Sequence, residues 1–185
     1  MKGDLDICDI VGEYWDTFEI GITIPKNYPN GVPLVFEISR KIPREDKRHI
    51  SKEGVCCVDI DHELLYLARR GLKLVDFIRD KAYPYFANQL YYKKNGCFAK
   101  GEFKHQLDGI LQFYDERLNI SDTEVAIRFL ERLVINKLPG RNDPCLCNTG
   151  KKYKYCHETS MAFLKSIGTE KVKSDLAQFK ETISN

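Results

Sequence analysis

Three thiols and one imidazole gather in a short stretch near the carboxy terminus. Cys145 and Cys147 enclose a single residue, Cys156 and His157 are adjacent, and residues 148–155 form the loop between the two pairs. Zinc in proteins favours four close ligands of this kind, and a set of four protein ligands leaves no position for a reacting water. The sequence therefore predicts one structural Zn²⁺ ion per chain. The alternative is a set of free thiols on a flexible tail.

A zinc site at these positions leaves four other cysteines to consider. Cys8 and Cys97 have no partner in the sequence and are expected to be packing or loop residues, whereas Cys56 and Cys57 are adjacent within Gly54–Ile60. A thiolate can accept an acyl group as a thioester, which a lysine amine then displaces. Such a reaction needs an accessible thiol and a hydrogen-bond donor for the tetrahedral intermediate. The Cys56-Cys57 pair is thus the second place to look for chemistry.

Charge is unevenly distributed along the 185 residues. The formal net charge is only +2, so no overall field favours nucleic acid and we expect no nucleic-acid partner. Around the cysteine motif, however, Asp143 faces five basic side chains: Lys137, Arg141, Lys151, Lys152 and Lys154. A basic surface of this kind fits acidic protein, RNA or anionic lipid, and the alternative is a solvated face.

The composition favours a folded protein of the cytoplasm. The start of the chain is acidic and short of apolar residues, which predicts no signal peptide, and no apolar run reaches the length of a membrane span. The uneven cysteine spacing suits a reducing compartment better than a disulfide framework. We therefore expect a cytoplasmic location.

The first forty residues show the alternation of strands. Apolar residues recur at every second position from Phe18 to Ile24, Leu5 and Ile7 alternate with polar residues, and Leu34–Ile38 follows a Pro- and Asn-Gly-containing turn. Three strands with short connections predict an antiparallel meander.

Helical spacing dominates after Ile60. A segment around Leu64–Ala68 ends at Gly71, and the next is expected to be broken or kinked at Pro84. Ser121–Glu124 is read as a capping box, with Ser121 opening a helix that runs to Val134. Two further helices are expected over Phe103–Tyr114 and, from an apolar stripe, over Val172–Ile183.

The cysteine motif resembles a known zinc module. Gly140–Cys145, Gly150–Lys154 and Cys156-His157 match the SEC-C motif, with Leu146 in place of the usual proline and Asn148-Thr149 in place of Gly-Ser. The resemblance implies a zinc-stabilised knob used for docking, which in the SecA translocation motor contacts a chaperone partner and the ribosome. It implies no reaction.

The order of features before residue 61 resembles the ubiquitin-conjugating fold. Ile24-Pro25 and Tyr28-Pro29 precede His49, and Gly54–Ile60 then matches the run that carries the family's catalytic cysteine. On this match Cys57 takes the nucleophile position and Cys56 the position of a core isoleucine. The sequence departs from the family in lacking its usual first helix.

The same resemblance suggests roles for the residues around Cys57. His49-Ile50-Ser51 stands in place of the family's His-Pro-Asn, so His49 would orient the loop, and Ser51 or a backbone N–H would replace the asparagine that supports the oxyanion. Asp61 and His62 would guide an incoming lysine, or simply form a solvated helix start.

The resemblance further implies a bacterial enzyme of antiviral (CBASS-type) operons. Its acyl donor would be a ubiquitin-like protein or the carboxy terminus of an operon partner such as a cyclic-oligonucleotide synthase. A lysine-bearing target protein would accept the acyl group, and an activating enzyme would load the cysteine. Two alternatives stay open: a non-catalytic docking module on the same fold, and a zinc adaptor of secretion or translation built on the SEC-C motif.

The expected fold class is α+β, a meander with flanking helices and a helical extension that carries the zinc knob. We expect a ubiquitin-conjugating-like domain over residues 1–117 and a connecting helix over 118–138. The SEC-C zinc motif follows over 139–158, and a carboxy-terminal helix over 159–185.

Overall fold

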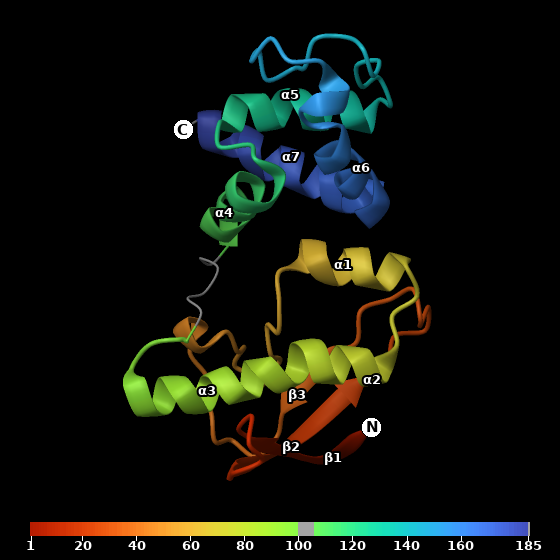
Figure 1. The fold of residues 1–185 in the computed structure, drawn as a ribbon. Helices are drawn as coiled ribbons and strands as arrows, with labels where there is room; N and C mark the ends of the chain where they lie inside the picture. Colours follow the sequence, from red (N-terminus) through yellow and green to blue (C-terminus); the bar gives the residue numbers. More distant parts are fainter. Residues whose placement is uncertain (100–105, 185) are drawn as a thin grey trace. The chain divides into compact units, whose positions relative to one another are not determined.

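The computed structural model describes residues 1–99 and 106–184 and divides into two compact units, Met1–Glu102 and Phe103–Asn185. Figure 1 traces the chain through them. The first unit contains the sheet and the second is helical, so the predicted α+β class is confirmed.

The sheet of the first unit is an antiparallel meander, as predicted. Its strands are β1 (Lys2–Cys8), β2 (Tyr14–Thr23) and β3 (Leu34–Glu37), in the order β1-β2-β3. Phe18 and Ile20 of β2 are buried while Glu19 between them is exposed, because successive side chains of a strand point to opposite faces.

The segment before Cys57 returns along β3. The Cys56 N–H donates to the Val35 carbonyl at 2.8 Å, and the Glu37 N–H donates to the Gly54 carbonyl at 2.9 Å. Gly54 has a φ of +90°, and a Cβ there would lie 2.8 Å from the Glu37 carbonyl oxygen. Only glycine fits this approach, which fixes where the chain delivers Cys57.

The helices of the first unit are α1 (Asp61–Arg69), α2 (Leu74–Phe77) and α3 (Tyr83–Asn95), with a π-helical stretch at Ile78–Ala82. Pro84 does not break the helix. It lies in the first turn of α3, directly after the π-helical turn, where the N–H that proline lacks is not required by α3. Figure 1 shows α2 and α3 running as one rod along the sheet. The Phe18 and Phe86 rings pack with their centroids 4.8 Å apart.

The second unit contains α4 (Gln106–Leu118), α5 (Thr123–Val134), a 3-10 turn at Tyr153–Tyr155, α6 (Glu158–Ile167) and α7 (Thr169–Ser184). Helix α4 lies in this unit, whereas the domain expected over residues 1–117 includes nearly all of it. The single carboxy-terminal helix expected over 159–185 is two helices, because Gly168 adopts φ 105° and ψ 148°. Phe103, expected to begin a helix, lies outside the described residues.

The cap of α5 differs from the prediction. The N-cap residue is Asp122, whose carboxylate accepts hydrogen bonds from the Glu124 and Val125 N–H groups, and Ser121 lies one residue outside the helix. A carboxylate at this position also interacts favourably with the positive end of the helix dipole.

Candidate metal centre and thiol site

The four predicted zinc ligands converge. The ligand atoms of Cys145, Cys147, Cys156 and His157 all lie within 4.8 Å of one another. The Cys147 and Cys156 sulfurs are 3.4 Å apart, and His157 Nδ1 lies 3.3 Å from Cys145 Sγ and 3.1 Å from Cys156 Sγ. A tetrahedral zinc ion with bonds of about 2.0–2.3 Å has ligands roughly 3.5–3.8 Å apart. The three pairs above are slightly closer than this and the full set extends to 4.8 Å, so small side-chain shifts would bring the four atoms around one zinc ion.

The His157 ring is held in one orientation from its far side. Its Nε2 atom lies 2.9 Å from the carbonyl oxygen of Asn119, at the end of α4. A carbonyl oxygen only accepts, so Nε2 carries the proton and the lone pair of the neutral ring is on Nδ1, which faces the thiols. Metal-binding histidines commonly donate their second N–H in this way.

The Asn119 carbonyl reaches the ring because of how α4 ends. Asn119 has a φ of +58°, its N–H donates to Asp115, and the Ile120 N–H donates to Tyr114 at 2.9 Å. This left-handed C-terminal turn suits asparagine or glycine and is strained for β-branched residues.

We predict that this turn contributes to zinc affinity. Asn119→Val should weaken zinc binding about tenfold, since the strained turn no longer holds the carbonyl against His157. Asn119→Gly should bind as the unchanged protein does. Competition with a chromophoric chelator measures both, and equal affinities of the two variants would contradict the role of the turn.

Backbone hydrogen bonds bring the two ligand pairs together. The Cys145 N–H donates to the Lys151 carbonyl and the Tyr153 N–H to the Asp143 carbonyl, both at 2.9 Å. Asn148 and Gly150 adopt positive φ values of 60° and 74°, which turn the loop back on itself. The segment between α5 and α6 otherwise has little regular structure, so the four ligands are the main connection between its two ends.

The thiols differ in acidity. Burial raises the pKa of Cys145 to about 12. Burial also acts to raise the pKa of Cys147, but hydrogen bonds from Thr149 and from the neighbouring thiols lower it to about 6. A bound dication would favour the thiolate at every cysteine of the cluster.

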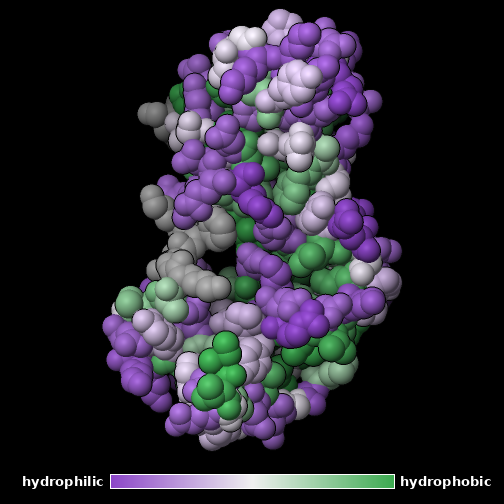
Figure 2. Space-filling model, in the orientation of Figure 1, coloured by the Kyte–Doolittle hydropathy of each residue, from purple (hydrophilic) through white to green (hydrophobic). Residues whose placement is uncertain are grey.

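The surface beside the cluster is basic. Lys137, Arg141, Lys151 and Lys152 are exposed, and the Lys154 ammonium lies 4.8 Å from the centre of the Tyr155 ring, which is 74% exposed. Figure 2 shows that the part of the second unit around the loop between α5 and α6, at the top of the view, is mainly hydrophilic. We call these five basic residues together with Tyr155 the basic face.

Cys56 and Cys57 differ in their surroundings. Cys56 is 6% exposed, lies in the hydrophobic core, and burial raises its pKa to about 12. The next residue, Cys57, is exposed, and its N–H donates to the His49 carbonyl at 2.8 Å. The structure thus places Cys56 as core, as the sequence predicts, and presents Cys57 at the surface beside the His49 backbone.

His49 and Ser51 belong to the loop that supports Cys57. His49 has a φ of +51°, and its ring centre lies 5.7 Å from that of Phe98. The Ser51 hydroxyl accepts from the Val55 N–H at 3.1 Å. The pKa of the Glu53 carboxyl is lowered by a hydrogen bond from its own backbone N–H and, after it, by one from the Ser51 hydroxyl. Both residues shape the turn before Cys57, and their part in any reaction stays a prediction.

The first turn of α1 is only partly exposed. Asp61 is exposed, as both expectations for this turn require, but His62 is fully buried and fits neither of them. Partial burial, followed by the Asp61 and Asp46 carboxylates, raises the pKa of the Cys57 thiol.

A buried arginine that the sequence did not single out fixes the loop around His49. Arg48 donates from Nε to Gln89 Oε1 at 2.7 Å, and its guanidinium lies 4.2 Å from the centre of the Tyr92 ring. Gln89 and Tyr85 donate back to the Arg48 carbonyl at 2.8 and 3.0 Å. These contacts join residues about forty positions apart, so no local pattern could have revealed them.

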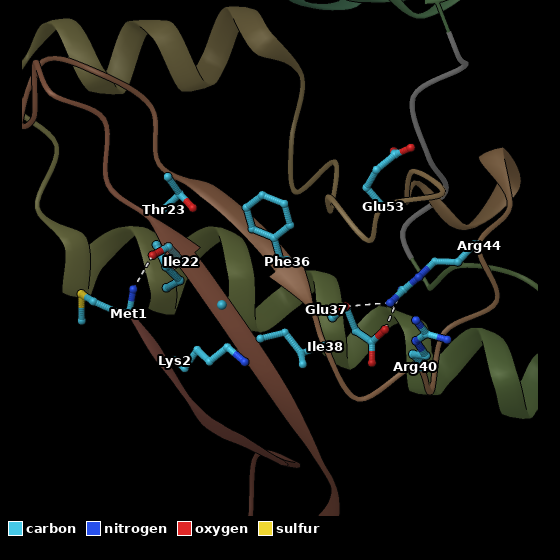
Figure 3. Close-up of a pocket in the computed structure, with 11 residues that line it drawn as sticks. Met1, Lys2, Ile22, Thr23, Phe36, Glu37, Ile38, Arg40, Arg44 and Glu53 are labelled. Carbon is cyan, nitrogen blue, oxygen red and sulfur yellow. Dashed lines mark hydrogen bonds and ion pairs between the residues drawn. The ribbon is translucent and has the colours of Figure 1, made fainter.

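A groove of about 530 Å³ crosses the strands of the first unit (Figure 3). Its charged side includes Arg44, which pairs with the buried Glu37 carboxylate at 2.6 Å and donates to the Glu37 carbonyl at 2.7 Å. Neither Cys57 nor His49 lines it. The Arg44–Glu37 pair packs against Gly54 and so helps to hold the segment that precedes the thiol.

Comparison with known proteins finds similarity at the zinc cluster. Residues 141–159 match the SEC-C motif. The protein translocase subunit SecA of Xylella fastidiosa (strain M23) is 40% identical over 60 residues, which is 31% of this chain and 7% of that protein. SecA of Chloroherpeton thalassium is 70% identical over 23 residues, 12% of this chain and 2% of that protein. SecA of Ruthia magnifica subsp. Calyptogena magnifica is 48% identical over 46 residues, which is 23% of this chain and 5% of that protein.

The chain therefore spans 7% or less of the length of these relatives, and the shared feature is the motif. No solved structure matches the chain. Among the described residues, no helix combines the length and the apolar character needed to cross a lipid bilayer.

Proposed function

We propose that the chain is a docking protein whose zinc-stabilised knob presents the basic face to an acidic protein surface. The observation that carries this proposal is the cluster of four convergent ligands with His157 held by Asn119. Four protein ligands leave zinc no position for substrate or water, so the ion would serve as a cross-link.

The basic face gives the docking role its chemistry. The four lysines and the exposed Tyr155 ring attract acidic partners, while Arg141 also pairs with Glu158 at 3.2 Å. Tyr and Arg are frequent anchors in interfaces. The motif's occurrence in protein translocase subunits fits an adaptor of secretion or translation.

Affinity purification with matched variants tests the docking role. Proteins captured by the full chain should be lost with Lys151→Glu/Lys152→Glu and retained with Lys173→Glu, an exposed lysine of α7. Those proteins should have acidic surfaces, and their capture should weaken as salt rises. Equal capture by the knob variant and the control would refute the proposal.

We propose as a second function that Cys57 carries an acyl group on a ubiquitin-conjugating-like fold. Its support is the exposed Cys57 thiol next to the buried Cys56, in a loop held by Arg48. The Cys57 thiolate would attack a donor thioester, form a new C–S bond and release the donor thiolate. A lysine amine would then attack the Cys57 thioester, forming a C–N bond and breaking the C–S bond, so that the Cys57 thiolate leaves and the amine's proton passes to water. The donor would be a ubiquitin-like protein or an operon partner's carboxy terminus, in antiviral defence.

The raised pKa of Cys57 predicts how its reactivity depends on pH. The thiolate is the nucleophile, so alkylation by iodoacetamide should accelerate as pH rises through the alkaline range. Asp61→Asn removes a carboxylate that raises this pKa, and should speed alkylation at pH 7.5 by about threefold. Mass spectrometry of the Cys57 peptide over time measures the rate. An unchanged or lower rate in Asp61→Asn would contradict the assignment.

Acyl transfer itself is tested with a ubiquitin-like protein bearing a carboxy-terminal thioester. Under non-reducing conditions an adduct sensitive to thiols should form, persist in Cys56→Ser and vanish in Cys57→Ser. An adduct that survives Cys57→Ser removes this function from consideration.

A further inference from the structure

The hairpin that joins β1 to β2 exposes four large apolar side chains. Ile10 is 103% exposed and Val11 83%, and Tyr14 and Trp15 follow at 58% and 46%. We call these four residues the hairpin tip. Scattered apolar residues are common on protein surfaces, but four exposed ones within six positions make the hairpin tip a candidate for burial by a partner.

The hairpin tip is ordered by its own hydrogen bonds. Asp9 Oδ1 accepts from the N–H groups of Val11 and Glu13 at 2.9 and 2.8 Å, and the Asp9 N–H donates to the Glu13 carbonyl. Because the loop is held in one conformation, a partner would lose little conformational entropy in binding it. Tyrosine and tryptophan are also the residues that most often dominate binding energy.

The charge around the hairpin tip selects the partner. Residues 1–19 contain six acidic side chains and one lysine, and Lys41 from outside this stretch pairs with Asp16 at 2.6 Å, so the surface stays acidic overall. Such a surface repels anionic lipid and nucleic acid, and favours a basic protein surface. Residues 137–154 of the same chain contain five basic side chains and one acidic side chain, with the exposed Tyr155 beside them.

We infer that the hairpin tip of one molecule docks on the basic face of a second molecule of this chain. The inference rests on the proposed docking role of the zinc knob and names its partner. Asp9 and Glu13 lie opposite the lysines of the basic face, and the apolar tip packs on Tyr155 and on the aliphatic parts of the lysine side chains. Because the two surfaces differ, the contact is head-to-tail, and a pair of molecules retains one unused hairpin tip and one unused basic face.

Two variants that each lose one surface test this arrangement. Ile10→Asp/Val11→Asp keeps the basic face, and Lys151→Glu/Lys152→Glu keeps the hairpin tip. All four residues are exposed, so both proteins should fold, which circular dichroism checks. Val75→Asp, at an exposed valine of α2, is the matched control and should associate as the unchanged chain does.

Sedimentation equilibrium gives the decisive comparison. The unchanged chain should form larger assemblies as its concentration rises, whereas each double variant alone should stay at the monomer mass of 21.5 kDa. An equimolar mixture of the two should reach twice that mass, because one intact contact remains. A mixture that stays monomeric overturns the inference.

Trp15 supplies a second readout, since it is the chain's single tryptophan. Mixing the two variants should shift its emission to shorter wavelength and reduce quenching by acrylamide, and high salt should reverse both changes. A monomeric mixture combined with protein capture that still depends on Lys151 and Lys152 would reject self-association alone. If the mixture stays monomeric and protein capture also does not depend on Lys151 and Lys152, the docking role is rejected as well.

Discussion

Removal of zinc from the Cys145–His157 cluster is expected to lower the unfolding temperature of the second unit by about 20 °C or more. The loop between α5 and α6 has little regular structure beyond the 3-10 turn at Tyr153–Tyr155. Without the ion, the buried Cys145 thiol and the partly buried Cys147 and Cys156 thiols would no longer be joined to one another and to His157 through a metal. Zinc binding to small domains supplies about 10–16 kcal/mol in peptides, and part of that is lost here. Differential scanning calorimetry with and without a chelator measures the shift.

The control for metal removal is a pair of cysteine variants. Cys145→Ser removes a buried ligand and should reproduce the effect of the chelator, without rescue by added zinc. Cys97→Ser changes an exposed cysteine outside the cluster and should melt as the unchanged chain does. If the chelated protein and Cys145→Ser both melt at the original temperature, the ion is not a structural cross-link.

The second large effect is expected in the first unit. Arg48→Ala should reduce the free energy of unfolding by about 3 kcal/mol, because it leaves the buried Gln89 Oε1 without the Arg48 donor and opens a space against Tyr92. The same change should release the loop at His49 and so increase the alkylation rate of Cys57. Urea denaturation followed by circular dichroism measures the stability.

Arg70→Ala is the matched control for Arg48→Ala. Arg70 also lies over a tyrosine ring, that of Tyr66 at 5.3 Å, but at the exposed end of α1. Interactions of exposed charges are worth little, so the change should cost less than about 0.5 kcal/mol. Equal losses for the two variants would show that burial of Arg48 contributes nothing.

Local patterns predicted the elements well where one physical rule controls them. Alternation identified β2, because one face of the strand is buried and the other is not. Ligand type and spacing identified the cluster of Cys145, Cys147, Cys156 and His157, since a single turn of chain has to bring the two pairs together.

Sequence reasoning failed where two neighbouring residues both suit one structural position, and where the structure depends on contacts between residues far apart in the sequence. Asp122 rather than Ser121 caps α5, although both residue types suit the position. Gly168 divides the carboxy-terminal helix, and the apolar stripe over Val172–Ile183 lies wholly on α7 and so says nothing of the break before it. The contacts of Asn119 with His157 and of Arg48 with Gln89 each join residues more than thirty positions apart.

X-ray absorption at the zinc edge, on the protein as purified, tests the central claim most directly. A closed structural site predicts about one zinc per chain with three sulfur neighbours at roughly 2.3 Å and one nitrogen at roughly 2.0–2.1 Å. Cys156→Ser should lose a sulfur from the coordination shell, and Cys57→Ser should leave the spectrum unchanged. A shell that contains a water oxygen, or a folded chain that carries no zinc, would contradict the account of a closed, docking-only knob.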